Sequence, residues 1–430
     1  MSESRINIMN NEFNIPDNWD KLKIKRLLLS KVTDGPHETP EFIDEGYPFL
    51  SVDSIVDGKL IFEGCRYISE EDYKRFKLKC NPQRDDVFMG KAASIGKIAI
   101  VDVDFNFSIW SPLALLRPNK NIILPKYLEY SLKSDYAQDQ IDLYSTSNTQ
   151  KNISMDDIPR IELFVPQIEQ QNQIVNYLDK KTSMINETIN KNKQLIELLE
   201  EKRITLINEV VTKGLNPDAP TKDSNVEWIG KIPKHWDLIK NKHIFKKSKV
   251  IVGPNWNKYN VLSLTKNGVI IKDIERNEGK MPSDFSIYQI VNPGNLLMCL
   301  FDIDVTPRCV GYIEKKGIVS SAYTELSAID NINMKYYYWW YLMLDIDKRL
   351  LHLSKNLRNS LSTDDFMALT VVKPPLEEQK QIDEFLTNEI SKINNTISKI
   401  EDNINLLDEY KTSLIHHVVT GKIDVRGEMI

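Results

Sequence analysis

Apolar residues recur at alternating steps of three and four along two stretches of the chain, a pattern typical of helices that pack along a seam. One stretch runs from Ile174 to Val210, and the other follows the Pro374-Pro375 pair. The pattern predicts two long helices that pack as a coiled coil. Their seam positions are Thr182, Ile185, Ile189, Asn192, Ile196, Leu199, Arg203, Leu206 and Val210 in the first helix, and Ile390, Ile393, Ile397, Ile400, Ile404, Leu407, Lys411, Leu414 and Val418 in the second.

Two polar residues, Asn192 and Arg203, interrupt the first seam. They are candidates for fixing the register and the orientation of the helices. The alternative interpretation is a core helix with these two residues at its edge.

The segment of residues 213–231 contains Gly214, Pro217, Pro220 and Gly230, so it is expected to be a loop. The preceding helix would be about 55 Å long at 1.5 Å per residue. A parallel pair of helices would need this segment to run back along that whole length, close to full extension. We therefore expect the helices to be antiparallel.

The surroundings of the two helices also occur twice. Asp156-Asp157 matches Asp364-Asp365, and Gln171-Asn172-Gln173-Ile174 matches Gln379-Lys380-Gln381-Ile382. Near the start of each half, Ile15-Pro16-Asp17-Asn18-Trp19 recurs as Ile232-Pro233-Lys234-His235-Trp236. Between these anchors the two halves differ almost everywhere. Two bodies that recognise different things would give such a divergence, whereas the need for a stable fold alone would not.

The two divergent bodies, residues 15–165 and 232–373, mix short strands with helices. The longest helix of each body is expected near Pro125–Ser134 and Met334–Leu344. The aromatic run from Lys335 to Tyr341 is interpreted as core, with base stacking as the alternative. Strands are expected at Pro48–Val52, Ile98–Val103, Ala114–Arg117, Asn260–Leu264, Val269–Ile271, Leu296–Leu300 and Val310–Ile313.

The composition is that of an ordinary globular chain, with 41% hydrophobic and 27% charged residues. The net charge of −5 excludes a uniformly basic nucleic-acid coat protein, but it allows a local basic face. The four cysteines form no CxxC pair, which argues for a reducing compartment. The N-terminus has no apolar signal region and no window approaches a membrane span, so we expect a cytoplasmic protein.

Two kinds of segment are suited to binding nucleic acid. Basic residues cluster after each repeated tryptophan, where they could contact phosphate or simply form a solvated strand edge. Loops rich in small polar residues, 145–151 and 354–359, precede the shared helices and carry side chains that read base edges, although ordinary loops have a similar composition. The basic candidates include Lys23, Lys25, Lys242, Lys246 and Lys247, and the loop candidates are Ser147, Asn148, Thr149, Gln150, Lys151, Lys355, Asn356 and Arg358.

The chain carries no recognisable catalytic motif. It has no nucleotide-binding GxxxxGK[ST], no GxGxxG after a strand, no HExxH and no GxSxG. The prolines Pro374-Pro375 are in the wrong context for the Asn-Pro-Pro-aromatic tetrad of amino-methyltransferases. We therefore predict no catalytic residue, no metal site and no cofactor in this chain.

The sequence as a whole resembles the specificity subunits of type I restriction–modification systems. The resemblance covers nearly the whole chain and both repeats, and its motifs are specific because they occur in order and twice. They are Pro374-Pro375-Leu376-Glu377-Glu378-Gln379, its looser copy Pro166-Gln167-Ile168-Glu169-Gln170-Gln171, the segment from Val226 to Trp236 and its shorter copy Ile15–Trp19, and Thr33-Asp34-Gly35-Pro36-His37-Glu38-Thr39-Pro40, which is similar to the family's Asp-Gly-x-His-x-Thr-Pro.

The resemblance implies an α+β fold, with two mixed α/β target recognition domains separated by two long helices that form an antiparallel coiled coil. The implied boundaries are 1–165 for the first recognition domain, 166–213 for the first helix, 214–373 for the linker and second recognition domain, and 374–430 for the second helix and tail. Each recognition domain would read one half of a split, asymmetric site on double-stranded DNA.

The resemblance also implies partners. The helices would fix the unread spacer and bind two methyltransferase subunits, which in turn join motor-nuclease subunits. S-adenosylmethionine, ATP and magnesium would be bound by those partner chains. A two-headed coiled-coil scaffold for other proteins is the alternative, and the paired polar and basic loops argue against it.

The DNA contacts implied for each body come from different motifs. The first body supplies Thr33, Asp34, Gly35 and His37, with Lys91, Ser94, Gly96 and Lys97 as further candidates. Gly96 would allow a close backbone approach, and a plain turn between strands is the alternative. The second body lacks the Asp-Gly-x-His segment, and Gln167 replaces one of the paired prolines in the first repeat, so contacts do not transfer from one body to the other. Its candidates are Asn255, Asn257, Lys258, Thr306 and Arg308.

Overall fold

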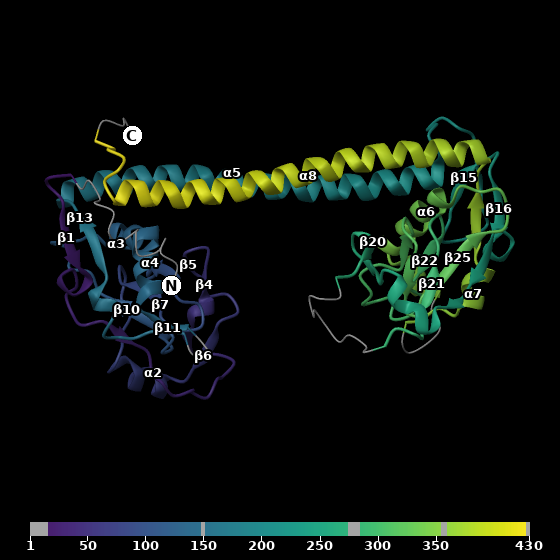
Figure 1. Cartoon of the computed structure of the whole chain (residues 1–430). Helices are drawn as coiled ribbons and strands as arrows, with labels where there is room; N and C mark the ends of the chain where they lie inside the picture. Colours follow the sequence, from purple (N-terminus) through teal and green to yellow (C-terminus); the bar gives the residue numbers. More distant parts are fainter. Residues whose placement is uncertain (1–15, 148–150, 274–283, 354–358, 427–430) are drawn as a thin grey trace. The chain divides into compact units, whose positions relative to one another are not determined.

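A computed structural model describes residues 16–147, 151–273, 284–353 and 359–426. The chain divides into two compact units, unit 1 with Met1–Asn192 and Glu401–Ile430, and unit 2 with Lys193–Ile400. Each unit therefore contains one body and parts of both long helices, α5 (Ile168–Lys213) and α8 (Leu376–Val419) (Figure 1).

The body of unit 1 is built on a four-stranded antiparallel sheet in the order β2-β10-β7-β8. Successive residues of a strand point to opposite faces, and both faces of this sheet are buried. Along β10 (Leu113–Leu116), Ala114 and Leu116 join the core beneath α3 (Pro125–Lys133) and α4 (Asp135–Tyr144), whereas Leu113 and Leu115 join a second core. The sheet therefore separates two hydrophobic layers.

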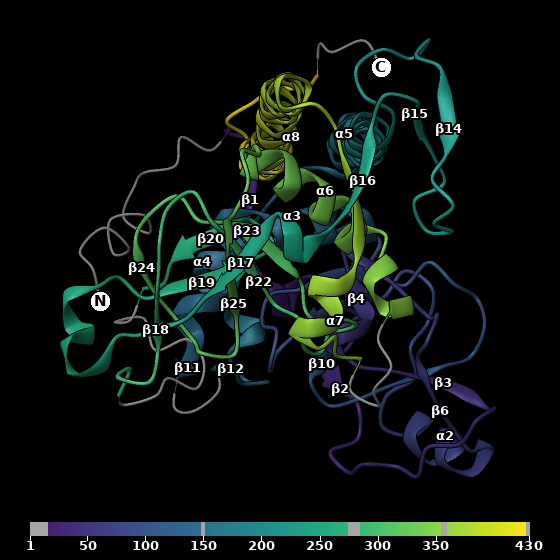
Figure 2. The ribbon, with the colours of Figure 1, turned by 90° about the vertical axis from the view of Figure 1, so that its right-hand side faces the viewer.

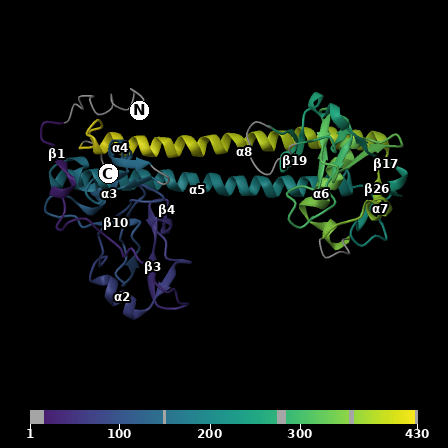
Figure 3. The ribbon, with the colours of Figure 1, turned by 60° about the horizontal axis from the view of Figure 1, so that its bottom comes forward.

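Smaller elements complete unit 1, and α2 and β3 lie at the end of the body away from α5 (Figure 3). β3 forms a three-stranded sheet with β6 and β9, and β1 pairs with β13. The remaining elements are β1 (Asp20–Lys23), η1 (Ile24–Arg26), β2 (Thr33–Asp34), β3 (Tyr47–Leu50), η2 (Val52–Ser54), β4 (Ile55–Val56), β5 (Lys59–Leu60), β6 (Arg66–Ile68), α2 (Glu70–Lys77), β7 (Val87–Gly90), β8 (Ile98–Ile100), β9 (Ser108–Ile109), β11 (Ser145–Ser147), β12 (Lys151–Ile153), η3 (Ile158–Arg160) and β13 (Glu162–Val165).

The body of unit 2 repeats this plan with a four-stranded antiparallel sheet in the order β17-β25-β22-β23. Helix α6 (Met334–Ile346) lies between this sheet and the long helices (Figure 2). Its aromatic run is buried, with Tyr336, Tyr337, Trp340 and Tyr341 all at 0% exposure, which confirms the interpretation as core. Base stacking by these four side chains is excluded by their burial.

The other elements of unit 2 surround its main sheet. They are β14 (Thr221–Asp223), β15 (Lys231–Pro233), β16 (Asp237–Lys240), η4 (Asn241–His243), β17 (Phe245–Ser248), β18 (Val250–Ile251), η5 (Gly253–Lys258), β19 (Leu262–Thr265), β20 (Gly268–Ile271), β21 (Gln289–Val291), β22 (Leu296–Met298), β23 (Val310–Tyr312), β24 (Gly317–Val319), β25 (Thr324–Ala328), η6 (Arg349–Leu353), α7 (Thr363–Ala368) and β26 (Thr370–Lys373).

The long helices pack along the predicted seam within each unit. In unit 1, Ile185 and Ile189 of α5 share a core with Leu414 and Val418 of α8. In unit 2, Val210 of α5 shares a core with Ile390, Ile393 and Ile397 of α8, and Ile196, Leu199 and Leu206 pack against it. The helices run antiparallel, and the prediction of an antiparallel coiled coil is confirmed.

Two polar contacts cross the seam at matching points of the repeat. In unit 1, Lys411 Nζ donates to Asn186 Oδ1 at 3.1 Å. In unit 2, Arg203 Nη1 donates to Asn394 Oδ1 at 3.0 Å. Because such contacts form at one register only, they support Arg203 as a residue that fixes the alignment of the helices. Asn192 gains no such support, since its buried Nδ2 has no hydrogen-bond partner in the part of the chain that the structure describes.

A buried glutamine near the start of each long helix joins that helix to its body. Gln171, at 0% exposure, accepts from Leu124 N at 2.8 Å and donates to Ile122 O and Pro166 O at 2.9 and 2.8 Å. Gln379, at 1% exposure, accepts from Asn333 N at 2.9 Å and donates to Pro374 O at 2.8 Å. The repeated Gln-x-Gln-Ile thus has a structural role.

We expect Gln171→Met to lower the free energy of unfolding of unit 1 by about 2 kcal/mol, because it leaves a buried N–H and two buried carbonyls without partners. The neighbouring Asn172 is exposed and hydrogen-bonds only within α5, so Asn172→Met is the matched control. Chemical denaturation of both variants measures the difference. Equal stabilities would contradict the structural role of Gln171.

The other end of each long helix also packs on a body. In unit 1, Val418, Val419 and the following Val425 join the core that contains Trp19. In unit 2, the hydroxyl of Tyr336 donates to Val211 O at 3.1 Å, and Gly214 lies against Trp236. Each body is therefore bounded by the start of one long helix and the end of the other.

The strands and helices expected in the bodies are present as β3, β8, β10, β19, β20, β22, β23, α3 and α6. Two expectations were wrong. Helix α4, with 10 residues, is longer than α3, with 9. The segment of residues 213–231 is not only a loop, because β14 pairs with β15 (Thr221↔Pro233) in a short hairpin. Among the described residues, no helix is both long and apolar enough to span a membrane.

Candidate nucleic-acid interface

A hairpin turn leaves the main sheet of unit 1 between β7 and β8, at residues 91–97, and a second hairpin lies beside it. Ile153 N donates to Lys91 O at 3.0 Å, and Asn152 forms a bridge with Ala92. These contacts bring the candidates Lys91, Ser94, Gly96 and Lys97 next to β11 and β12, which contain Ser147 and Lys151. The candidates Asn148, Thr149 and Gln150 lie outside the described residues.

The carboxylate of Asp34, on β2, holds three basic side chains at this edge of unit 1. Its Oδ1 accepts from Lys79 Nζ at 2.6 Å, while His37 Nε2 and Lys91 Nζ lie 2.9 and 3.1 Å from its Oδ2. Lys79 Nζ also donates to Gly35 O at 2.7 Å. One buried negative charge thus organises two lysines and a histidine, which leaves an excess of positive charge.

The exposure of these side chains separates their roles. The side chains of Asp34 and Lys91 are 7% and 10% exposed, whereas those of Lys79 and His37 are 46% and 70% exposed. Lys79 and His37 can therefore reach a ligand, and Asp34 positions them. Burial by itself would raise the pKa of Asp34, but the hydrogen bonds and charges of Lys79 and Lys91 outweigh it and lower that pKa.

Two glycines of this region are required by their surroundings. A Cβ on Gly35 would collide with the carbonyl oxygen of Ile109. Gly96 has a φ of +77°, and its carbonyl accepts from Gln138 Nε2 of α4 at 3.0 Å. A Cβ there would collide with the side chain of Gln138. Gly96 therefore brings the hairpin close to α4, and a close approach to DNA stays a prediction.

The remaining candidates of unit 1 have varied surroundings. The hydroxyl of Thr33 donates to Cys80 Sγ at 3.7 Å, and burial raises the pKa of Cys80 to about 11. Lys97 Nζ donates to Ile55 O at 3.0 Å, and Ser94 is half-buried. Lys23 is exposed on β1, where it pairs with Glu162 of β13, and Lys25 is exposed on η1, which lies beside η3. None of the contacts described connects them to the Asp34 cluster.

Unit 2 has a corresponding hairpin between β22 and β23, at residues 299–309, which contains Thr306 and Arg308. Leu361 N donates to Leu300 O at 2.8 Å, at the matching place of the Ile153–Lys91 contact in unit 1. In both units, therefore, a described residue shortly after the polar segment, Ile153 or Leu361, is hydrogen-bonded to the β-hairpin. The candidates Lys355, Asn356 and Arg358 lie outside the described residues.

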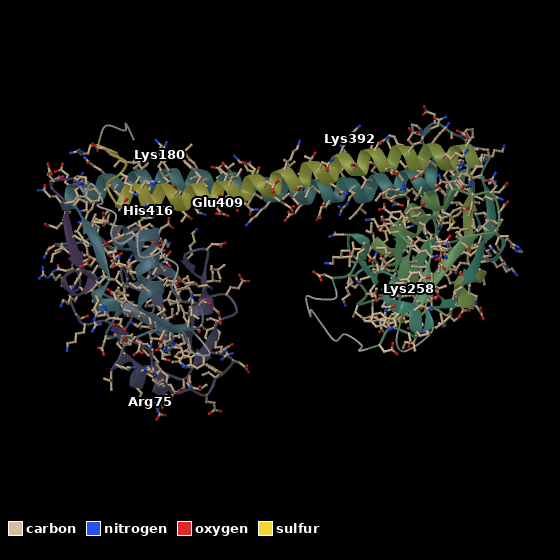
Figure 4. The ribbon with its side chains drawn as sticks, in the orientation of Figure 1. Arg75, Lys180, Lys258, Lys392, Glu409 and His416 are labelled. Carbon is tan, nitrogen blue, oxygen red and sulfur yellow. The ribbon has the colours of Figure 1, made fainter. Side chains whose placement is uncertain are left out.

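The other candidates of unit 2 are spread over its surface. Lys242, Lys246 and Lys247 are exposed on η4 and β17, and Lys247 Nζ lies 2.9 Å from Asp364 Oδ1. Asn255, Asn257 and Lys258 are exposed on η5, and Figure 4 shows Lys258 in the lower part of this body. Within the part of the chain that the structure describes, no three His, Cys, Asp or Glu side chains gather closely enough to hold a metal ion.

Sequence reasoning missed Lys79, Gln138, Asp345 and Lys348. Lys79 follows α2, whose Arg75 lies 3.2 Å from Glu38 in the segment that contains His37 (Figure 4). Lys79 lies 45 residues along the chain from Asp34, and Asp345 lies 36 residues from Cys309, so no local motif marks these contacts.

Comparison with protein families identifies the family of this chain. The model of the "Type I restriction modification DNA specificity domain" matches residues 16–198 and 309–405, well over half of the chain. The chain belongs to this family. It is a non-catalytic DNA specificity subunit of a type I restriction–modification system, as its sequence resemblance had indicated.

Relatives of known name agree with this assignment. The specificity subunit is 25% identical to a putative type I restriction enzyme specificity subunit, MjaX, from Methanocaldococcus jannaschii, over 96% of this chain and 95% of the relative. It is 26% identical to the EcoBI specificity subunit of Escherichia coli, over 41% of this chain and 37% of the relative.

Solved structures share the fold of the specificity subunit. One chain comes from work on the complex assembly and conformational transition of the type I system. It aligns with a TM-score of 0.68 at 14% identity, over 97% of this chain and 100% of that one. The HsdS subunit from Thermoanaerobacter tengcongensis aligns with a TM-score of 0.51 at 12% identity, over 96% and 100% of the two chains. The predicted fold class is thereby confirmed.

Proposed function

We propose that the two bodies, residues 1–165 and 214–373, are target recognition domains that read the two unlike halves of a split DNA site. The observation that carries this proposal is the pair of matching hairpins. Each hairpin leaves the equivalent position of its own four-stranded sheet and is hydrogen-bonded to the equivalent residue, Ile153 or Leu361, yet the side chains of the two hairpins differ. A common scaffold with different side chains suits two readers of different base sequence.

In this proposal basic side chains contact phosphates and hairpin side chains contact base edges. Phosphate contacts set the position on the duplex and give the salt dependence, whereas base contacts give the specificity. Lys79 and His37, held by Asp34, supply phosphate contacts in unit 1. The hairpin residues of 91–97 in unit 1, and Thr306 and Arg308 in unit 2, supply contacts to bases.

The long helices, residues 166–213 and 374–419, fix the unread spacer and bind two methyltransferase subunits, which join motor-nuclease subunits. S-adenosylmethionine, ATP and magnesium act on those partner chains. Exposed apolar side chains on the helices support a docking role. Leu198 and Leu406, which match in the repeat, are 61% and 62% exposed. Large exposed apolar side chains at matching positions suit protein contacts.

Co-expression with the methyltransferase subunits of the same cell, followed by mapping of methylated adenines across the genome, tests the proposed function. We expect a split, asymmetric motif. Exchange of residues 1–165 for those of another specificity subunit should change one half of that motif only. Stable association without any methylated motif would favour a protein-binding scaffold instead.

We expect Lys79→Met to weaken DNA binding about equally for all sequences and to lower the slope of log K against log salt by about 1, because one phosphate contact is lost. Lys120→Met is the matched control. Its partner Asp85, at 2.6 Å, precedes β7, so it lies at the other end of that strand from the hairpin. Titration of duplex DNA at several salt concentrations measures the slope. An unchanged slope would remove Lys79 from the interface.

A further inference from the structure

The hairpin of unit 2 is held by contacts within it and by residues that do not lie on it. The backbone carbonyl oxygen of Asp302, a residue with a φ of +47°, accepts from Thr306 N at 2.8 Å. The hydroxyl of Thr306 donates to Phe301 O at 3.2 Å. Val305 at the turn is 74% exposed, while the side chain of Arg308 is 21% exposed. Arg308 is therefore largely packed against the body, and something in the body must determine its direction.

Asp345, near the end of α6, faces the base of this hairpin. Its side chain is fully buried, and its Oδ2 accepts from Cys309 N at 3.0 Å. The same oxygen lies 3.6 Å from Arg308 Nη1. One carboxylate thus binds both the backbone of the hairpin at residue 309 and the guanidinium of the preceding residue.

Lys348 adds a second anchor from the same end of α6. Its Nζ donates to Ile303 O and Thr306 O, both at 3.0 Å, and lies 3.5 Å from Asp345 Oδ1. Its backbone has a φ of +50°, which a residue with a Cβ rarely adopts. The hairpin backbone is therefore tied to α6 at residues 303, 306 and 309.

Burial of a charge is costly, and a buried ion pair adds little stability compared with apolar residues of the same size. A buried ion pair has a larger effect on the orientation of the two side chains, because it forms in one arrangement only. An arginine reads guanine through two parallel hydrogen bonds, so its value for recognition depends on its direction. Asp345, whose Oδ2 lies 3.6 Å from Arg308 Nη1, is the carboxylate that can set that direction for Arg308.

We propose that Asp345 and Lys348 are positioning residues for sequence recognition. They fix the hairpin of residues 299–309 and the side chain of Arg308, so that the base preference of one half-site depends on a carboxylate that never touches DNA. This inference rests on the proposed function, in which the hairpin meets DNA. Unit 1 anchors its hairpin by other means, through Asp34 and Gln138, so the effect is confined to one half-site.

The test compares Arg308→Gln, Asp345→Asn and the double variant in the full chain, purified with its methyltransferase subunits. Each complex selects from a pool of random duplex DNA, and the bound fraction is sequenced. We expect the wild type to select a split motif. Each single variant should lose preference, about tenfold, at the same positions of one half-site. The double variant should lose no more than Arg308→Gln alone, because both changes break one contact.

The matched control is Asp347→Asn, which removes an ion pair to Arg349 at the same end of α6. It should leave the motif unchanged. Asp345→Asn changes a fully buried side chain of unit 2, so Lys348→Met tests the same anchor from a side chain that is 36% exposed. It should weaken preference in the same half-site. Retention of the other half-site, together with an unchanged melting profile, shows that the variants are folded.

Three results would overturn the proposal. Asp345→Asn and Lys348→Met could leave the motif intact, the losses of the two single variants could multiply in the double variant, or both half-sites could weaken together. A wild-type complex that selects no split motif would refute the proposed function and this inference with it. A split motif in the wild type, with any of the first three results, would refute this inference alone.

Discussion

Replacing Asp34 with asparagine should lower the stability of unit 1 by about 3 kcal/mol and abolish recognition of one half-site while the other is still read. The side chain of Lys91 is only 10% exposed, and its ammonium is paired with Asp34 at 3.1 Å. Loss of one partner of a buried pair leaves the other charge uncompensated. His37 and Lys79 lose their common anchor in the same step.

The stability difference between the wild type and Asp34→Asn should depend on pH. The pKa of Asp34 is lowered in the folded chain from its ordinary value of 3.8. A group with a lowered pKa stabilises the fold fully above its ordinary pKa, and that stabilisation is lost as the pH falls through the folded value. The difference should therefore be complete above about pH 4 and shrink below it.

The matched control for Asp34→Asn is Asp104→Asn. Asp104 pairs with Arg84 at 2.5 Å, but its side chain is 76% exposed, so its loss should change stability by less than about 1 kcal/mol. Denaturation at several pH values, combined with mapping of the methylated motif, measures both effects. If Asp34→Asn kept full recognition of both half-sites, Asp34 would not organise the interface.

Ile393→Asp should disrupt the coiled coil in unit 2 at a cost of about 4 kcal/mol. Ile393 is 7% exposed and belongs to the core that joins α8 to α5 and to the body. A carboxylate there loses its water inside an apolar core, and the apolar contacts of the isoleucine are lost as well. We expect loss of the second half-site and of stable binding to methyltransferase subunits.

The adjacent residue provides the control for Ile393→Asp. Lys392 is 72% exposed on α8, and its Nζ lies 2.6 Å from Glu389 (Figure 4). Lys392→Asp introduces the same side chain one position away on the solvent face and should cost less than about 1 kcal/mol. Thermal unfolding and co-purification measure both variants. Similar behaviour of the two would mean that the seam does not hold the helices at this point.

The long helices could be predicted from sequence because their apolar residues repeat with a fixed period. Every seam position is buried or half-buried in the structure, including the polar Asn192, Arg203 and Lys411. The partner of Arg203 could not be predicted, because Asn394 is one of several asparagines on α8 and only the register of the two helices selects it. The periodicity of the apolar residues predicts which face of a helix is buried. The contacts between the two helices also depend on their register, which periodicity does not give.

The candidate interface was predictable only in part. The Asp-Gly-x-His motif marked Asp34 and His37, but Lys79 reaches them through the path of the chain around α2, which no local pattern encodes. Likewise Arg308 was selected as a basic hairpin residue, whereas Asp345 was hidden in an aromatic helix. Long-range ion pairs depend on tertiary packing, so sequence reasoning identified one member of each pair, Asp34 and Arg308, and missed its partner, Lys79 or Asp345.

The division of the chain into units has a consequence for its synthesis. Unit 2 is a single stretch of sequence, whereas unit 1 needs both Met1–Asn192 and Glu401–Ile430. During synthesis, unit 2 can complete its folding before unit 1. At that stage Ile185 and Ile189 still lack their packing partners Leu414 and Val418. Until the last residues emerge, the first-made body carries an uncovered apolar stripe. A chain that ends before the last turns of α8 would therefore destabilise unit 1, which lies mainly at the other end of the sequence.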